Sequence, residues 1–245
     1  MQQSIDVMGV SFSTLNLTET LEHLTAQADR KEGEGELFHL ITANPEIVMT
    51  SRQDAQLKQI MDAAGLVTPD GIGIVMAAKW KGTPLRERVT GFDILTGMLE
   101  IGSRKGYSFY FLGADEETSR KSVETIMARY PGVRIAGRQN GFFDKKDEDR
   151  IVREIGSAKP DFLIVAMGAP YSEKWINKYR TVLNAKITFG VGGSLDVIAG
   201  KVKRAPVVWQ KLHVEWLYRL LSNPSRWRRQ LVLPKFAWKV ITGKA

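Results

Sequence analysis

The stretch "DFLIVAMG", residues 161–168, is a run of β-branched and other apolar residues that predicts a β-strand ending in a glycine turn. Stretches of helical character flank it at 146–159 and 172–180, and a further strand is predicted at 186–192. Two strands joined by a helix-length crossover form a right-handed βαβ unit, in which the strands run parallel. This part of the chain therefore predicts a mostly parallel sheet.

The same alternation of strands and helices runs through the first 200 residues. Further strands are predicted at 5–10, 36–42, 107–113 and 133–138, and further helices at 17–30, 70–80, 91–106 and 115–130. Asn16 is the expected N-cap of its helix, with Glu19 three residues later, and Pro45 opens another helical stretch. We expect an α/β protein with a Rossmann-like, mostly parallel sheet, helices on both faces and a C-terminal helical appendage.

Charge is distributed unevenly along the 245 residues. Residues 201–245 contain eleven Lys or Arg and one acidic residue, Glu215, whereas residues 1–200 contain 24 basic and 26 acidic residues. Four of the six Trp also lie in the last 45 residues. We therefore expect a nearly neutral body at 1–200 and a basic, Trp-rich appendage at 201–245, unlike a uniformly basic nucleic-acid-binding protein.

The composition also bears on location. The sequence contains no Cys, which excludes a disulfide framework and a thiolate metal site and favours a cytosolic setting. The N-terminus has no basic segment followed by an apolar run, so no signal peptide is predicted. No run of about 18 apolar residues predicts a membrane span.

Three loops after predicted strands are rich in small and polar residues: "TAN" (42–44), "GAPYSEKW" (168–175) and "GVGGSLDVIAG" (190–200). Ligands of open parallel sheets bind beyond the carboxyl ends of the strands. Glycine lets a backbone approach a phosphate closely, although it also serves a tight strand-to-helix turn. Because three such loops share one edge, we expect a ligand site there.

Several site classes lack their motif. "GVGGSL" has no third Gly and comes after the last strand, so a dinucleotide fingerprint is rejected, and a P-loop is absent. His23, His39 and His213 have no ligand spacing, which argues against a His-based metal site. "DED" (147–149) matches the D-x-D of metal-dependent sugar transferases but lies within a charged helix start, so we expect a solvated face.

Asp70 in "TPDGIGIV" (68–75) is the acid with two open interpretations. Asp commonly caps a helix N-terminus, and its position before an apolar helical stretch favours that role. A carboxylate at a pocket edge can instead accept a proton. Arg86 and Arg88 follow closely and could serve as anion partners or as solvated surface groups.

The motifs "TANPEIV", "TPDGIGIV", "RVTGFDIL", "FLGA", "NGFF", "GAPYSEKWI" and "GVGGSLDVIAGKVKRAPVVWQK" together resemble the WecG/TagA/CpsF glycosyltransferases, glycosyltransferase family 26. The resemblance covers about residues 5–240 in the family's order and is strongest to the TagA-type N-acetylmannosaminyltransferases. It implies metal-independent, inverting transfer of N-acetylmannosamine from UDP-ManNAc to GlcNAc on undecaprenyl diphosphate, without a cofactor, for the linkage unit of wall teichoic acid.

The resemblance also implies roles for individual residues. The half at about 1–105 would hold the active site, and the half at about 106–200 would bind UDP. Asp70 would be the general base for the acceptor 4-hydroxyl, Phe142 would stack on uracil, and Asp196 would bind the ribose. The implied groups are catalytic Asp70, Thr42, Asn44 and Arg88; UDP-sugar-binding Phe142, Ser172, Gly192, Gly193, Ser194 and Asp196; and acceptor-diphosphate or membrane-binding Arg219, Arg226 and Arg229.

Ser172 departs from the family pattern G-x-P-x-Q-E, because this chain has "GAPYSE". Losing the longer amide arm could alter which sugar is accepted. Alternative donors within the family are UDP-ManNAcA and UDP-glucose, for another surface polysaccharide. A different class of function is a non-enzymatic nucleotide- or nucleic-acid-binding module.

The appendage has three interpretations. Residues 205–221 place Trp209, Leu212, Trp216 and Leu220 on one helical stripe, and Asn223 with Pro224 would start a second helix. The segment could be a packed subdomain, a single-strand nucleic-acid binder or an interfacial membrane element. A lipid-linked acceptor favours the interfacial membrane element. We therefore expect no nucleic-acid partner and a cytoplasmic protein that binds the inner face of the plasma membrane peripherally. The family also implies homo-oligomers.

Overall fold

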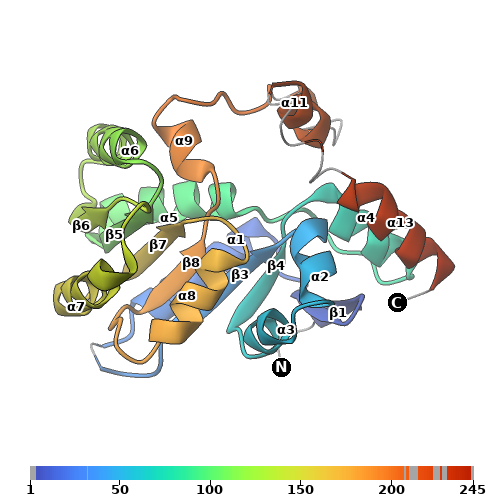
Figure 1. Cartoon of the computed structure of the whole chain (residues 1–245), viewed down its shortest axis with the longest axis horizontal. Helices are drawn as coiled ribbons and strands as arrows, with labels where there is room; N and C mark the ends of the chain where they lie inside the picture. Colours follow the sequence, from blue (N-terminus) through green and yellow to red (C-terminus); the bar gives the residue numbers. More distant parts are fainter. Residues whose placement is uncertain are drawn as a thin grey trace.

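The computed structural model describes residues 4–31, 33–206, 208–209, 215–222, 227 and 231–243. Figure 1 shows a central sheet with helices on either side and a C-terminal segment that returns to the body near α4. The predicted α/β class is therefore confirmed.

The main sheet has six strands in the order β4-β3-β8-β7-β5-β6, and all five neighbouring pairs are parallel. Its strands are β3 (Phe38–Ala43), β4 (Leu66–Pro69), β5 (Ser108–Gly113), β6 (Arg134–Gln139), β7 (Phe162–Ala166) and β8 (Ile187–Gly190). The stretch at 161–168 forms β7, near the middle of the sheet and buried throughout. A strand covered on both faces is what an apolar run without alternation favours.

Successive side chains of each strand point to opposite faces, and the cores follow that alternation. Leu40, Phe111 and Ile164 belong to a core with α1, α5, α6 and α9, whereas Leu112 and Val165 pack with α7 and α8. A third core joins β3 and β4 to α2, α3 and α4.

The helices of the body are α1 (Leu17–Ala28), α2 (Pro45–Ser51), α3 (Ala55–Asp62), α4 (Ile72–Trp80), α5 (Gly91–Lys105), α6 (Glu116–Arg129), the 3-10 turn η1 (Lys145–Asp147), α7 (Glu148–Ala158), α8 (Tyr171–Tyr179) and α9 (Ser194–Ile198).

One prediction for the N-terminal half is wrong, and one strand was not predicted. The segment at 5–10 is not one strand of the sheet but a hairpin of β1 (Ser4–Val7) and β2 (Val10–Ser13), because Met8 and Gly9 adopt positive φ and reverse the chain. Strand β4 was not predicted, since its four residues carry too short a pattern. The expected capping box of Asn16 and Glu19 is confirmed.

The appendage returns to the body through its last helix. The described helices are α11 (Glu215–Ser222) and α13 (Val232–Thr242), and the predicted helix at 205–221 is confirmed only in part, because Ala205 and Pro206 are not helical. Phe236 and Val240 of α13 are buried in the core that contains α2 and α4. Arg226, Arg229, Leu212, Asn223 and Pro224 lie outside the described residues; Arg219 lies in α11, but its side chain is not described. Within the described ranges, no helix is long and apolar enough to cross a bilayer.

Candidate active site

Four loops with polar or small residues meet at the carboxyl edge of the sheet. They follow β3, β4, β7 and β8, which are near neighbours in the parallel order. The predicted grouping of "TAN", "GAPYSEKW" and "GVGG" at one edge is therefore confirmed. The loop after β4 adds Asp70 to the same edge.

Asp70 faces the N-terminus of α5 and does not cap α4. Its backbone N–H donates to the Ala43 carbonyl at 3.0 Å, and its Oδ2 accepts from the Gly91 N–H at 3.4 Å. The N-cap of α4 is Gly71, which has φ 128° and makes no side-chain cap bond. The capping interpretation is wrong because this backbone turn, which only Gly adopts readily, directs the carboxylate to the next helix.

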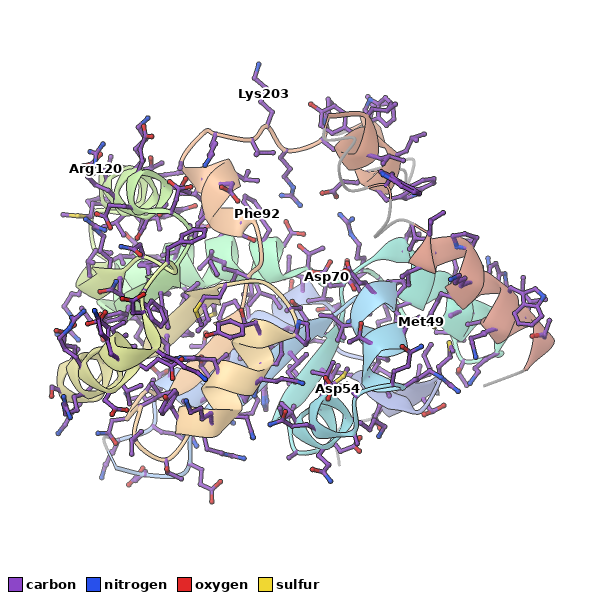
Figure 2. The ribbon with its side chains drawn as sticks, viewed as in Figure 1. Met49, Asp54, Asp70, Phe92, Arg120 and Lys203 are labelled. Atoms are coloured by element: carbon purple, nitrogen blue, oxygen red, sulfur yellow. The ribbon has the colours of Figure 1, made fainter. Side chains whose placement is uncertain are left out.

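The position of Asp70 suits an ionised carboxylate. The partial positive charge at a helix N-terminus stabilises an anion placed before its first turn. Asp70 lies at the first turn of a 15-residue helix whose own cap, Thr90, accepts from the Asp93 N–H. Figure 2 shows Asp70 and Phe92 at this edge. An ionised carboxylate only accepts hydrogen bonds, so a carboxylate at this position has the chemistry of a proton acceptor.

Thr42 and Asn44 lie on the strand and turn beside Asp70. The Thr42 hydroxyl donates to the Gly190 carbonyl at 3.5 Å, which joins the ends of β3 and β8. A Cβ on Gly91 would stand 3.0 Å from Thr42 Oγ1, so the start of α5 packs directly on this side chain. Asn44 caps α2 by accepting from the Ile47 N–H at 3.0 Å. The structure therefore brings Thr42, Asn44 and Asp70 together.

Arg88 connects this edge to the appendage. The N–H of the next residue, Val89, donates to the Pro69 carbonyl at 3.0 Å. This bond holds the backbone after Arg88 against the last residue of β4, which directly precedes Asp70. The Arg88 guanidinium donates to Glu215 of α11 at 2.9 Å, and both side chains are largely buried. Glu215 is the single acid of the appendage. Sequence analysis singled it out as an isolated charge but not as a partner of the site.

Two further ion pairs fix the segment between α9 and α11. Arg204 donates to Asp93 at 2.7 Å and lies 4.5 Å over the Phe92 ring. Lys201 donates to Asp115 at 2.7 Å, at the N-terminus of α6, and this ammonium holds the pKa of the Asp115 carboxyl well below its usual range. The connecting segment therefore contacts the N-terminus of α6 and the first turn of α5.

The residues predicted to bind UDP lie on the loops that follow β6, β7 and β8 at the same edge, where β5 separates β6 from β7. Phe142 is 84% exposed, and its N–H donates to Asn140, whose amide donates to Glu116. Arg138 also donates to Glu116 and holds the pKa of that carboxyl below its usual range. These contacts present an exposed ring on an ordered loop.

The glycine-rich loop after β8 turns into α9. Gly192 has positive φ, Gly193 precedes the helix, and the buried Ser194 hydroxyl donates to the Val191 carbonyl at 2.7 Å. Asp196 lies in the first turn of α9, where its carbonyl accepts from the Lys201 and Val202 N–H groups. Ser194 thus shapes the turn, whereas the Asp196 side chain is the acidic group of this loop.

Glu173 is a site residue that sequence analysis missed. Its side chain is buried, its Oε2 has no hydrogen-bond partner among the residues that the structure describes, and a Cβ on Gly190 would stand 2.9 Å from its Oε1. Burial raises the pKa of the Glu173 carboxyl to about 7. Glu173 lies three residues before Ile176, on the same side of α8. This helical spacing was the signal that could have predicted its burial. Ser172, next to it, is also buried, and its hydroxyl accepts from the Met167 N–H at 3.3 Å.

No candidate metal centre emerges from the part of the chain that the structure describes, where no three His, Asp or Glu side chains gather. The "DED" stretch is not wholly solvated as expected. Glu148 is buried and accepts from Lys178 at 2.7 Å and from the Tyr179 hydroxyl at 2.5 Å, so it joins α7 to α8. Asp149 is exposed.

The chain matches known proteins along nearly its whole length. The model of the glycosyl transferase WecG/TagA/CpsF family matches residues 5–245. A Bacillus spizizenii protein named N-acetylglucosaminyldiphosphoundecaprenol N-acetyl-beta-D-mannosaminyltransferase is 36% identical over 240 residues, which cover 98% of this chain and 91% of that protein. Proteins of the same name from Bacillus subtilis and Staphylococcus aureus are 33% and 32% identical over the same share of this chain, covering 91% and 93% of their own lengths.

We predict that Glu173 makes stability fall between about pH 4.5 and 7. The folded chain holds the Glu173 proton up to a pKa of about 7, whereas the unfolded chain releases it near 4.5. Stability is then fully present below pH 4.5 and is lost as the pH rises through 7, by about 3 kcal/mol. Glu173→Gln, which cannot ionise, should flatten this slope in urea unfolding at pH 5 and pH 8. Exposed Glu22→Gln is the control, and equal slopes for the Glu173 variant and wild type would contradict the assignment.

We also predict that Arg88 and Glu215 are energetically coupled. Removing either charge leaves a largely buried partner, so Arg88→Met and Glu215→Gln should each lower the hydrogen-exchange protection of α11, and the double variant should cost about 1–3 kcal/mol less than the sum. The matched control is the exposed pair Arg104 and Glu100, whose coupling should stay below about 0.5 kcal/mol. Additive effects at Arg88 and Glu215 would show that the pair does not hold the appendage.

Proposed function

This chain belongs to the glycosyl transferase WecG/TagA/CpsF family, and we propose that it moves N-acetylmannosamine from UDP-ManNAc to the 4-hydroxyl of GlcNAc on undecaprenyl diphosphate. The names of its relatives support this acceptor and this sugar. The observation that carries the proposal is the Asp70 carboxylate at the sheet edge, beside Thr42 and the first turn of α5.

The reaction is a single displacement at the anomeric carbon. The acceptor oxygen forms the new bond to that carbon while its proton passes to the Asp70 carboxylate, and the bond to the UDP oxygen breaks with its electron pair leaving on UDP. One carboxylate base is sufficient, because inversion needs no protein nucleophile. The first turn of α5 places a partial positive charge beside the Asp70 carboxylate, which favours an anion there.

The leaving UDP develops negative charge that fixed positive groups must stabilise. Arg88 follows the loop that carries Asp70 and donates one hydrogen bond to Glu215 within the described residues, and a guanidinium has further N–H groups that suit a diphosphate oxygen. We assign Arg219, Arg226 and Arg229 of the appendage to the same task. On the nucleotide side, the exposed Phe142 ring supplies a face for uracil, and Asp196 with the Gly192–Gly193 turn supplies a ribose and phosphate site.

The appendage is proposed to bind the membrane that presents the acceptor. Helix α13 has two apolar faces: Phe236 and Val240 pack on the body, while Leu231, Trp238 and Ile241 are exposed on the opposite side. Lys235 and Lys239 flank the exposed stripe. A Trp-bearing helix with adjacent lysines suits the headgroup region of an anionic bilayer. The expected location is the cytoplasmic face of the membrane, as a peripheral protein.

We predict that Asp70→Asn lowers transfer at least about a hundredfold, because the amide cannot accept the acceptor proton. UDP-ManNAc binding, measured by calorimetry, should persist, since Asp70 contacts the acceptor and not the nucleotide. Exposed Asp149→Asn is the matched control. The assay uses a water-soluble GlcNAc-diphosphoryl-lipid analogue with a panel of UDP-ManNAc, UDP-ManNAcA and UDP-glucose. Near-normal turnover of Asp70→Asn would remove it as the base, and turnover of another donor would reassign the sugar.

We predict that the exposed face of α13 governs membrane binding. Deleting the appendage would uncover the body core, so point changes are the sharper test: Trp238→Glu and Ile241→Glu should each weaken sedimentation with phosphatidylglycerol vesicles about tenfold or more, through lost apolar burial and added repulsion. Val182→Glu, which is 48% exposed before β8, should leave vesicle binding unchanged. Equal binding by all three variants would contradict membrane contact through this helix.

A further inference from the structure

We propose that helix α4 of the body is a second membrane-contacting element, which enters the bilayer interface at Met76 and Trp80 beside α13. This inference rests on the proposed membrane binding of the appendage and extends it to the segment that directly follows Asp70. Its occupant is an anionic lipid surface.

The first observation is the exposure of Trp80. Of the two Trp outside the appendage, Trp175 is buried in the core with α7 and α8, whereas Trp80 is 48% exposed. The neighbouring Met76 is 42% exposed. Large apolar side chains left in water on one short helix indicate a contact surface when they lie next to others of the same kind.

The second observation is that α4 and α13 pack against each other. A Cβ on Gly73 would stand 3.9 Å from the Phe236 ring, and Phe236 and Val240 share a core with Ala77. Figure 1 shows the two helices adjacent at the same end of the molecule. The exposed side of α4 thus continues the surface that carries Trp238 and Ile241.

The helix geometry separates a buried side of α4 from an exposed one. Ile74, Ala77 and Ala78 face the core, while Met76, Lys79 and Trp80 are exposed at the i, i+3 and i+4 positions of a single face. This arrangement presents two large apolar groups and a cation outward from one strip of helix.

Charge complementarity favours a lipid surface over a second protein copy. Residues 72–81 and 231–243 contain four lysines (Lys79, Lys81, Lys235 and Lys239) and no acidic residue. Asp6 lies beside this face and contacts Lys81 at 3.5 Å. Aromatic rings interleaved with lysines match the headgroup layer of an anionic bilayer, where Trp is enriched and each Lys is attracted. Two copies meeting through this face would bring like charges together.

The position of α4 gives this contact a catalytic consequence. The helix starts two residues after Asp70 and ends at Trp80, so its nine residues span about 14 Å. With Trp80 at headgroup depth, Asp70 stands no farther from the lipid than this helix and the two-residue link before it, about 20 Å. The diphosphate and sugar of a lipid-linked acceptor extend from the lipid toward the base, so α4 would set the height at which that acceptor meets Asp70.

The absence of Cys makes a site-specific test available. Met76→Cys, Ile241→Cys and Met127→Cys variants of the full chain are each labelled with an environment-sensitive fluorophore and titrated with phosphatidylglycerol vesicles. Met127, on α6, is the matched control because it is also methionine and is 55% exposed. We expect an emission blue shift and protection from aqueous quencher at positions 76 and 241, and neither change at 127.

Each outcome separates this inference from the proposed function. A response at 241 without one at 76 would overturn the role of α4 while leaving appendage binding intact, and no response at either would overturn both. A concentration-dependent shift at 76 without vesicles would make the face a self-association surface instead. As a functional readout, Met76→Glu should lose about tenfold in transfer to an acceptor embedded in vesicles and keep its rate on the water-soluble analogue; loss on both acceptors would indicate a structural effect.

Discussion

The parallel pairing of β3 between β4 and β8 is the constraint on which the site depends. Parallel strands end at the same edge, so this pairing places Thr42, Asp70 and Gly190 at adjacent strand ends although they are up to 148 residues apart. The Thr42–Gly190 hydrogen bond and the close packing of Gly91 leave little freedom at the junction. Because β3 and β4 are buried and the Asp70 N–H donates to the Ala43 carbonyl, the core holds the backbone that carries this carboxylate.

Charge pairing then ties the appendage to that edge. The segment after α9 is held by Lys201 with Asp115, by Arg204 with Asp93, and finally by Glu215 with Arg88. The last pair reverses the general pattern, because here the acid comes from the basic appendage and the base from the body. A substrate diphosphate near Arg88 would meet a guanidinium already oriented by Glu215, so the position of α11 and the electrostatics of the site are linked.

The fold could be predicted because strand and helix periods are local. The prediction of strands failed at two places. The pattern at Leu66–Pro69 was too short to recognise, and the reversal at Met8–Gly9 turned an apparent strand into a separate hairpin. Asp70 was identified, but its orientation depended on the backbone at Gly71 and on a helix that begins 21 residues later. Glu173 and Glu215 were not placed, because an acidic residue shows its burial only when the surrounding elements are assembled.

The buried Glu173 also shows what this edge requires of its backbone. Gly190 has no side chain, so its Cα accommodates the carboxyl on one sheet face, while its carbonyl accepts from Thr42. A larger residue at 190 would displace Glu173 or separate β3 from β8. Either change would shift the strand ends next to Asp70. The carboxyl is most readily buried while it is neutral, since an ionised group without a partner is costly in a dry interior. The end of β8 therefore lies between a buried carboxyl and the strand end that carries Thr42.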